Sequence, residues 1–212
     1  MNKPIKCLIS AGPTREWIDA VRFISNPSSG KMGFELAEAA RKRGFEVTLV
    51  SGPVLIPSPE GIIYKMVETA LEMREVLVEL FPQSDLTIMS AAVSDHRPEF
   101  LGGKKIKKNE FPESLSLIPN PDILQELGSM KSPNQKLIGF AAESNDHLAN
   151  GKKKLEAKNL DWIVVNDISN PKIGFESEMN QVTLLSRNNE HFSFPLSSKK
   201  QIASAILNQV WK

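Results

Sequence analysis

The sequence is poor in the features that mark several large classes of protein. It has one cysteine, Cys7, among 212 residues, so no disulfide can form within the chain. No apolar run is long enough to span a bilayer, and residues 1–6 do not resemble the start of a signal peptide. The 26 Lys and Arg residues against 25 Asp and Glu leave a net charge of +1, so no overall field attracts nucleic acid or an anionic membrane. We therefore expect a soluble, cytoplasmic protein with no nucleic-acid or membrane partner, in which any anion site is local.

The short motifs of several enzyme classes are also missing. The three histidines are scattered, and no Cys/His cluster has the spacing of a zinc site. A phosphate-binding P-loop needs G-x-x-x-x-G-K-[ST], but Ser25 stands at the first glycine and Met32 follows Lys31. The segment that starts at Gly12 does not have the G-x-G-x-x-G pattern of a dinucleotide site, and no serine lies in a G-x-S-x-G context. P-loop nucleotidases, nicotinamide-dependent dehydrogenases and serine hydrolases are therefore disfavoured.

What is present is the composition of a globular protein, with 41% hydrophobic and 24% charged residues, and a length that suits one domain over residues 1–212. Short apolar segments alternate with amphipathic helical ones. The pattern predicts strands at 5–10, 46–50, 62–67, 85–90, 136–142 and 161–165, with helices from Ser28-Ser29 to Gly44, at 69–81 and at 146–159. This alternation predicts an α/β fold: a Rossmann-like, open, mostly parallel sheet with helices on both faces. A hairpin (181–187 and 191–194) and a final helix (198–211) are expected at the C-terminus.

Small and polar residues follow four of the predicted strands. They occupy residues 12–14, 91–95, 142–143 and 166–167. The carboxyl ends of parallel strands share one edge of the sheet, where ligands of such folds bind. We therefore expect these segments to meet at a common site.

Three further segments have two interpretations each. Residues 24–33 are rich in Ser and Gly and open a helix, so they either bind a phosphate or carboxylate or merely cap the helix. Residues 104–108 contain four lysines within a segment, 97–115, that has no regular pattern; it is either a solvated loop or a lid over an anionic ligand. The lysines of 152–158 likewise form either a solvated helix face or part of an anion site.

Longer motifs point to one family. Residues 10–16 (SAGPTRE), 21–26 (VRFISN) and 28–33 (SSGKMG) resemble the phosphopantothenate–cysteine ligase domain that often follows a flavin-dependent decarboxylase in one bacterial polypeptide. The resemblance continues in order through 50–53, 91–95, 105–108, 120–124, 139–143, 158–161 and 166–169, and so covers nearly the whole chain.

The resemblance implies a two-step ligation. The carboxylate of 4′-phosphopantothenate attacks the α-phosphate of CTP, releasing pyrophosphate and leaving an acyl-cytidylate. The amine of cysteine then attacks the acyl group, giving CMP and 4′-phosphopantothenoylcysteine. Mg²⁺ is expected on the triphosphate, and no residue of the chain is assigned as its ligand.

The resemblance also implies roles for individual residues. Asn26, Arg22 and Lys105 would be catalytic: Asn26 would hold the acyl intermediate, Arg22 would assist the second step, and Lys105 would neutralise charge on the phosphates. The nucleotide would be bound by Ala91, Ala92, Asp95, Lys105, Ile118, Pro119, Asn120, Pro121, Phe140, Lys154 and Lys158. Phosphopantothenate would be bound by Gly12, Asn26, Ser28, Ser29, Gly30 and Ala92.

The sequence also departs from the family pattern. Pro27 stands where His is common, and His96 stands where Tyr is common. The chain begins one strand before the first ligase motif, so we expect no flavin site in it and a decarboxylase on a separate chain. A homodimer is expected by resemblance, with the C-terminal hairpin as a candidate contact. The alternatives are a nucleotide-binding module without activity and, less favoured, an oxidoreductase.

Overall fold

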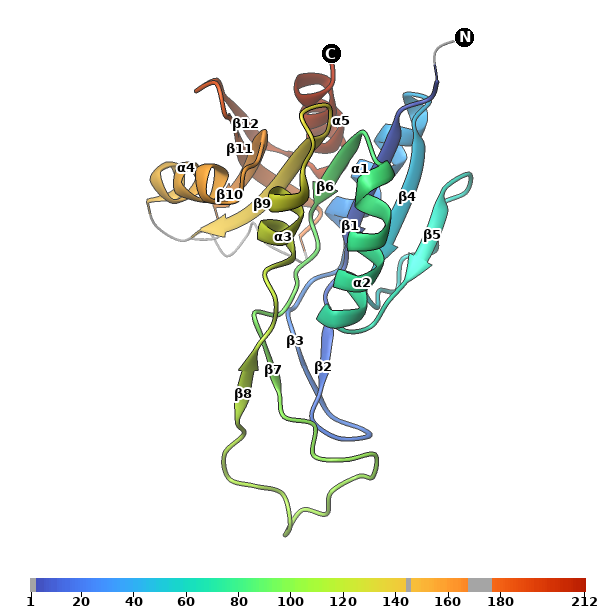
Figure 1. The fold of residues 1–212 in the computed structure, drawn as a ribbon, viewed down its shortest axis with the longest axis vertical. Coiled ribbons are helices and arrows are strands. Elements are labelled where there is room, and N and C mark those ends of the chain that lie inside the picture. Colours follow the sequence, from blue (N-terminus) through green and yellow to red (C-terminus); the bar gives the residue numbers. More distant parts are fainter. Residues whose placement is uncertain (1–2, 144–145, 168–176) are drawn as a thin grey trace.

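The computed structural model describes residues 3–143, 146–167 and 177–212, whose centre is an eight-stranded sheet with helices on both faces (Figure 1). The strand order is β12-β11-β10-β9-β6-β1-β4-β5. Neighbours from β10 to β5 pair in parallel, whereas β10, β11 and β12 pair antiparallel. The bounds are β1 (Lys6–Ala11), β4 (Glu46–Ser51), β5 (Ile63–Met66), β6 (Leu86–Met89), β9 (Lys136–Glu143), β10 (Trp162–Asp167), β11 (Met179–Ser186) and β12 (His191–Ser198). The predicted fold class is confirmed.

Two hydrophobic clusters, one on each face of the sheet, explain why its central strands are apolar throughout. On one face, Cys7 and Ile9 of β1 pack with α1 (Lys31–Lys42) and α5 (Lys199–Val210). On the other face, Leu8 packs with α2 (Ala70–Leu80), α3 (Ile123–Met130) and α4 (His147–Ala157). Successive strand residues point to opposite faces, so a strand covered on both sides must be apolar at nearly every position.

The predicted N-cap of α1 is wrong. The cap is Gly30, with φ of 78°, and not Ser28 or Ser29, although the Ser28 hydroxyl accepts a hydrogen bond from the Gly30 N–H at 3.3 Å. The left-handed backbone favours glycine, and a Cβ built there would lie 2.7 Å from Cγ1 of Val54. Close packing of the loop, which sequence patterns do not report, decides where the helix begins.

An arm projects from the body, built from two short ribbons (Figure 1). One ribbon pairs β2 (Arg15–Trp17) with β3 (Phe23–Ser25), and the other pairs β7 (His96–Pro98) with β8 (Leu117–Pro119). Neither ribbon was expected from the sequence. The segment 97–115 therefore starts as a paired strand, and only the stretch between β7 and β8 is an irregular loop.

A short helix and a 3-10 turn lie outside the sheet and the arm. Helix α3 was not predicted; the Asp122 side chain caps it by accepting from the Gln125 N–H at 3.0 Å. A short 3-10 turn, η1 (Phe81–Gln83), follows α2. The helices in the described part of the chain are too short or too polar to serve as membrane spans.

Candidate functional site

A cavity of about 300 Å³ lies where β6, β9 and β10 end and α1 begins. It is lined by Asn26, Ser28, Gly30, Lys31, Met32, Gly33, Ser90, Ala91, Ala92, Val93, Asp95, Phe140, Ala141, Ala142, Lys154, Asn166, Asn180 and Lys199. We call it the strand-end pocket. Three of the four segments expected at a common edge contribute to it, and residues 12–14 lie next to it through the contact of Ala92 with Gly12.

The first turn of α1 forms one wall of the strand-end pocket. Gly33 allows the helix to approach the sheet, because a Cβ there would lie 2.5 Å from Cβ of Ala11 and 2.8 Å from Oγ of Ser90. The first backbone N–H groups of a helix have no partners within the helix, and the helix dipole places positive potential there. This wall is suited to a phosphate or a carboxylate.

The loop after β6 forms the opposite wall, and hydrogen bonds fix its backbone. The Asn26 side-chain amide donates to the carbonyls of Ala92 and Val93, at 3.1 and 3.3 Å. The Ala92 N–H donates to the Gly12 carbonyl at 2.9 Å, and the Ala91 N–H donates to the Ser10 hydroxyl at 3.2 Å. Asn26 is thereby joined to the small residues that the resemblance places beside the acyl phosphate.

Lysine and asparagine side chains give the pocket a polar, basic end. Lys31, which forms an ion pair with Glu178, lines it together with Lys154 and Lys199. Lys199 is only 4% exposed, and its burial, together with the charge of Lys31, lowers its pKa to about 8. The buried Oδ1 of Asn166 has no hydrogen-bond partner among the described residues. Three ammonium groups around one cavity favour an anionic ligand with several negative charges.

The structure gathers eight of the predicted site residues in the strand-end pocket. They are Asn26, Ser28, Gly30, Ala91, Ala92, Asp95, Phe140 and Lys154. The others do not line it: Gly12, Arg22, Ser29, Lys105, Ile118, Pro119, Asn120, Pro121 and Lys158. Gly12 lies directly behind Gly30, since a Cβ at Gly30 would be 3.2 Å from its Cα. Lys158 forms an ion pair with Asp122 at 2.7 Å.

The predicted residues 118–121 connect the pocket to the arm instead of lining it. The Asn120 side chain donates to the Ser94 carbonyl at 2.9 Å and accepts from Nη1 of Arg97 at 2.9 Å. Its backbone N–H donates to the Asp95 carbonyl at 2.8 Å. The second ribbon is therefore hydrogen-bonded to the loop that carries Asp95.

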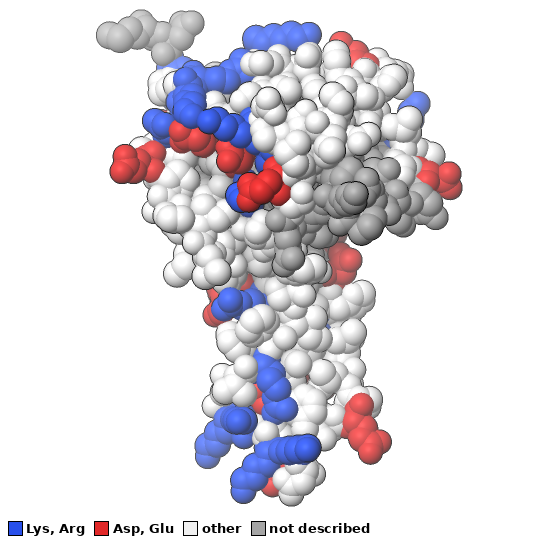
Figure 2. Space-filling model, turned by 180° about the vertical axis from the view of Figure 1, so that it is seen from behind, with Lys and Arg blue, Asp and Glu red and all other residues white. Residues whose placement is uncertain are grey.

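Arg22 and Lys105 belong to the arm. Lys105 is exposed in the loop between β7 and β8, as are Lys104, Lys107 and Lys108. Figure 2 shows the corresponding cluster of basic side chains at the far end of the arm. Arg22 lies at the turn between β2 and β3, and its Nη2 donates to the Ile106 carbonyl at 2.9 Å. Arg22 therefore contacts the residue that follows Lys105, and both Arg22 and Lys105 lie outside the strand-end pocket.

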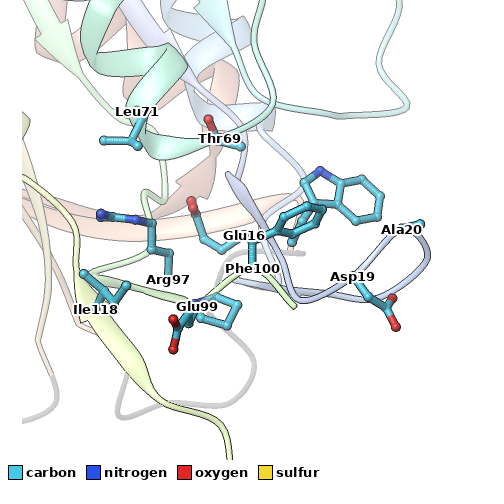
Figure 3. A pocket seen from close by; sticks show the side chains of 11 residues that line it. Glu16, Asp19, Ala20, Thr69, Leu71, Arg97, Glu99, Phe100 and Ile118 are labelled. Carbon is cyan, nitrogen blue, oxygen red and sulfur yellow. The ribbon is translucent and has the colours of Figure 1, made fainter. Parts of the chain in front are cut away.

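A larger cavity, of about 490 Å³, lies at the base of the arm (Figure 3). Apolar side chains form much of its lining, together with the charged residues Glu16, Arg97 and Glu99. The lining residues are Glu16, Trp17, Asp19, Ala20, Thr69, Leu71, Arg97, Pro98, Glu99, Phe100 and Ile118. Of the predicted site residues only Ile118 lies here, so size alone does not identify the functional site.

No group of three or more His, Cys, Asp or Glu side chains within the described ranges is arranged to hold a metal ion. Asp95 is the acidic side chain that lines the strand-end pocket. Mg²⁺ keeps several waters and is commonly held by one or two carboxylates together with substrate phosphates. The single carboxylate of Asp95 therefore fits a magnesium ion only if other ligands of the ion come from a bound molecule or from water.

Five polar lining residues had no role in the sequence-based prediction: Lys31, Ser90, Asn166, Asn180 and Lys199. Asn166 was noted only as following a strand, and Asn180 and Lys199 were not singled out. Lys199 stands in an ordinary Ser-Ser-Lys-Lys run at a helix start. It reaches the pocket because β11 and β12 pair back onto β10, an antiparallel addition whose register is not readable from local patterns. Residues 168–169 of the resemblance lie outside the described residues.

Comparisons with known proteins identify the family of the chain. The family described as the DNA/pantothenate metabolism flavoprotein C-terminal domain matches residues 3–212. A relative named cysteine/cysteine sulfinic acid decarboxylase, from an unknown prokaryotic organism, is 45% identical over 99% of this chain and 59% of its own length. The coenzyme A biosynthesis bifunctional protein CoaBC of Vibrio cholerae serotype O1 is 42% identical over 97% of this chain and 52% of its own length.

This chain therefore spans between half and three fifths of those two curated relatives. A solved structure of the C-terminal domain of CoaBC covers the same extent as the chain itself. It is 40% identical, has a TM-score of 0.83, and is aligned over 97% of this chain and 93% of its own. The chain belongs to the family of the DNA/pantothenate metabolism flavoprotein C-terminal domain, the domain that CoaBC proteins carry at their C-terminus.

Proposed function

We propose that this protein is a phosphopantothenate–cysteine ligase that uses CTP in coenzyme A biosynthesis. A carboxylate oxygen of 4′-phosphopantothenate attacks the α-phosphorus of CTP, and the bond to pyrophosphate breaks. The amine of cysteine then attacks the acyl carbon of the resulting acyl-cytidylate, loses a proton, and displaces CMP. The product is 4′-phosphopantothenoylcysteine.

One observation carries the proposal: the strand-end pocket joins an anion-binding wall to the Asn26–Ala92 wall. The helix N-terminus at Gly30 and the ammonium groups of Lys31, Lys154 and Lys199 suit a triphosphate. The fixed Asn26 side chain and the Ala92 backbone would lie beside the carboxyl end of phosphopantothenate, which becomes the acyl group of the intermediate. Both reactants of the first step can therefore be held in one cavity, which is the condition for attack on phosphorus.

The nucleoside and the metal have matching surroundings. Phe140 offers an apolar surface for the base and ribose, and Asp95 offers a carboxylate beside them. Mg²⁺ would arrive on the triphosphate and neutralise part of its charge. CTP is the nucleotide expected from the family resemblance, and ATP is the alternative co-substrate.

Lys105 and Arg22 need a movement, or a second copy of the chain, to act at this pocket. Both lie on the arm, outside the lining of the strand-end pocket. The loop around 97–115 would act as a lid that brings Lys105 to the phosphates of the same chain. In the expected homodimer, the arm of a second copy would do the same.

The names of several relatives support a role in coenzyme A biosynthesis. CoaBC proteins are named as bifunctional proteins of coenzyme A biosynthesis, and this chain matches about half of them. The decarboxylase name belongs to a protein of which this chain matches 59%, so it carries no activity to this chain. A decarboxylase acting on the product is a proposed separate partner.

The test is pyrophosphate release from CTP and Mg²⁺, with and without phosphopantothenate and cysteine, repeated with ATP. The proposal predicts release only when phosphopantothenate is present, and 4′-phosphopantothenoylcysteine only after cysteine is added. A folded protein that binds CTP, as judged by a raised melting temperature, but releases no pyrophosphate with either nucleotide would be a binding module without this activity.

A further inference from the structure

The turn between β2 and β3 is built around a buried carboxylate that the mechanism above does not use. Asp19 has no exposed surface. Its Oδ1 accepts from the backbone N–H groups of Val21 and Arg22, both at 3.0 Å. These two bonds close the turn and fix the direction of the Arg22 side chain. In Figure 3 the carboxylate points away from the cavity at the base of the arm.

The second oxygen of Asp19 connects this turn to the lysine loop. Oδ2 accepts from Nε and Nη2 of Arg22 at 3.0 and 2.5 Å, and from the backbone N–H of Ile106 at 3.2 Å. Nη2 of Arg22 also donates to the carbonyl of Ile106 at 2.9 Å. Both polar groups of the Ile106 backbone are therefore held by the Asp19–Arg22 pair, although these residues are more than eighty positions apart in the chain.

Two more contacts anchor the same loop on either side of Ile106. The Leu101 N–H donates to the Ile18 carbonyl at 2.8 Å. The Arg22 guanidinium lies over the Phe111 ring, 3.9 Å from its centroid. The side chains of Lys104, Lys105, Lys107 and Lys108 are exposed around this fixed point. The loop has charged side chains directed to solvent and an anchored backbone.

We propose that Asp19 is a positioning residue, which holds the backbone of Ile106 and thereby sets where the neighbouring Lys105 ammonium can reach. The inference rests on the proposed function, in which Lys105 neutralises charge on the phosphates. Lys105 has a long, flexible side chain, so a fixed backbone reduces the conformational freedom lost when it engages a ligand. The Arg22 guanidinium also holds the pKa of Asp19 well below its usual range, so the carboxylate stays charged at neutral pH.

Trypsin cleavage of the whole protein tests the positioning without any assay of activity. Asp19→Asn replaces an acceptor with an amide that presents N–H groups to donors, so the loop should be released and its lysines cleaved about tenfold faster. Glu16→Gln is the matched control. Glu16 is also a buried acid of the first ribbon, but it accepts from the Ala70 N–H at 3.0 Å, a bond in which no residue of the lysine loop takes part. Cleavage of the loop at the wild-type rate in a folded Asp19→Asn protein would overturn the proposal.

Ile106→Pro provides a second variant if Asp19→Asn does not fold. Proline has no backbone N–H, so this variant loses the hydrogen bond from residue 106 to the Asp19 carboxylate and keeps the Asp19–Arg22 pair. Faster cleavage after Lys104, Lys107 and Lys108 is expected, with the melting temperature of the body unchanged; the Lys105–Pro bond of this variant resists trypsin and is not scored. Wild-type cleavage in this variant would show that the hydrogen bond does not hold the loop.

A double-mutant cycle on pyrophosphate release tests whether Asp19 acts through Lys105. Asp19→Asn should reduce the rate about tenfold, and the Asp19→Asn/Lys105→Gln protein should be no slower than Lys105→Gln alone. Independent, multiplying losses would assign Asp19 another role. If the wild type released no pyrophosphate, the proposed function would fail while the cleavage result still decided the positioning.

Discussion

At the residue scale, Lys199 has an environment unlike that of most lysines. Its pKa of about 8 lies below the ordinary 10.5, so folding favours the neutral amine. The unfolded chain therefore binds more protons between these values, and the free energy of unfolding should rise with pH from about 8 to about 10.5. This rise should disappear in Lys199→Met, as measured by urea unfolding at several pH values. An equal rise in both proteins would place its origin elsewhere.

A bound polyphosphate should reverse the effect on Lys199, because negative charge favours the ammonium form. CTP binding near pH 8 should then take up protons, and the affinity should fall between pH 7 and pH 9. Calorimetry in buffers of different ionisation enthalpy measures this uptake. Equal proton uptake by wild type and Lys199→Met would contradict the location of the phosphates beside Lys199.

Asn26 gives a second prediction at this scale. In Asn26→Asp, a carboxylate oxygen would face the carbonyls of Ala92 and Val93 in place of an amide donor. The repulsion should disturb the wall that holds the acyl group, so the cysteine step should slow more than pyrophosphate release. Acyl-cytidylate should then accumulate in quenched reactions analysed by mass spectrometry.

Asn188→Asp is the matched control for Asn26, because Asn188 is exposed at the C-terminal hairpin turn. Its turnover should equal that of the wild type. If both steps slowed equally in Asn26→Asp, Asn26 would be a general binding residue and not one that acts mainly in the second step.

The pocket residues that sequence motifs predicted share a simple property. Asn26, Ala91, Ala92 and Asp95 lie in loops next to strand ends or a helix start, where parallel-sheet topology brings distant segments together. Asn180 and Lys199 were missed because their position depends on the antiparallel strands at the edge of the sheet. Lys158 was predicted in the nucleotide site, but in the structure it forms an ion pair with Asp122 and does not line the strand-end pocket.

At the element scale, the contact between α1 and the sheet sets the shape of the strand-end pocket. Alanine normally stabilises a helix interior relative to glycine by about 1 kcal/mol. At Gly33, however, the added Cβ would lie 2.5 Å from Cβ of Ala11, so the strands or the helix must shift. Overpacking costs about 1–3 kcal/mol, which outweighs the gain. Gly33→Ala should therefore lower the free energy of unfolding, measured in urea.

Gly103→Ala is the control for Gly33, since nothing lies within 4 Å of the Cβ it would add. Its free energy of unfolding should stay within about 0.5 kcal/mol of the wild type. A Gly33→Ala protein as stable as Gly103→Ala would show that α1 does not press against the sheet as closely as described.

Elements differed in how well periodicity predicted them. The long strands and most helices were predicted within a few residues, because both faces of the sheet are covered and the helices are amphipathic. The strands of the arm have three residues each, too few to show an alternating pattern. Helix α3 has eight residues and begins after Asn-Pro-Asp, which the sequence reading treated only as part of a motif.

At the scale of the whole molecule, the body and the arm have separate tasks in the proposed reaction. The body holds the strand-end pocket, while the arm carries Arg22 and the lysine loop (Figure 1). The open, mostly parallel sheet could be anticipated from strand–helix alternation, but the separation of Lys105 from the pocket could not. The place of the arm depends on the pairing of short ribbons, which leaves no periodic pattern in the sequence. Whatever brings Lys105 to the pocket, a movement of the arm or a second copy of the chain, leaves no such pattern either.

The proposed reaction requires the strand-end pocket to activate a carboxylate as an acyl-cytidylate before cysteine enters. The most direct measurement is to incubate the wild-type protein with phosphopantothenate, Mg²⁺ and CTP labelled at the α-phosphate, without cysteine, and to isolate the protein-bound label. We expect a labelled acyl-cytidylate that cysteine converts to CMP and an equal amount of 4′-phosphopantothenoylcysteine. Label that remains CTP, or that becomes CMP equally well without phosphopantothenate, would contradict it.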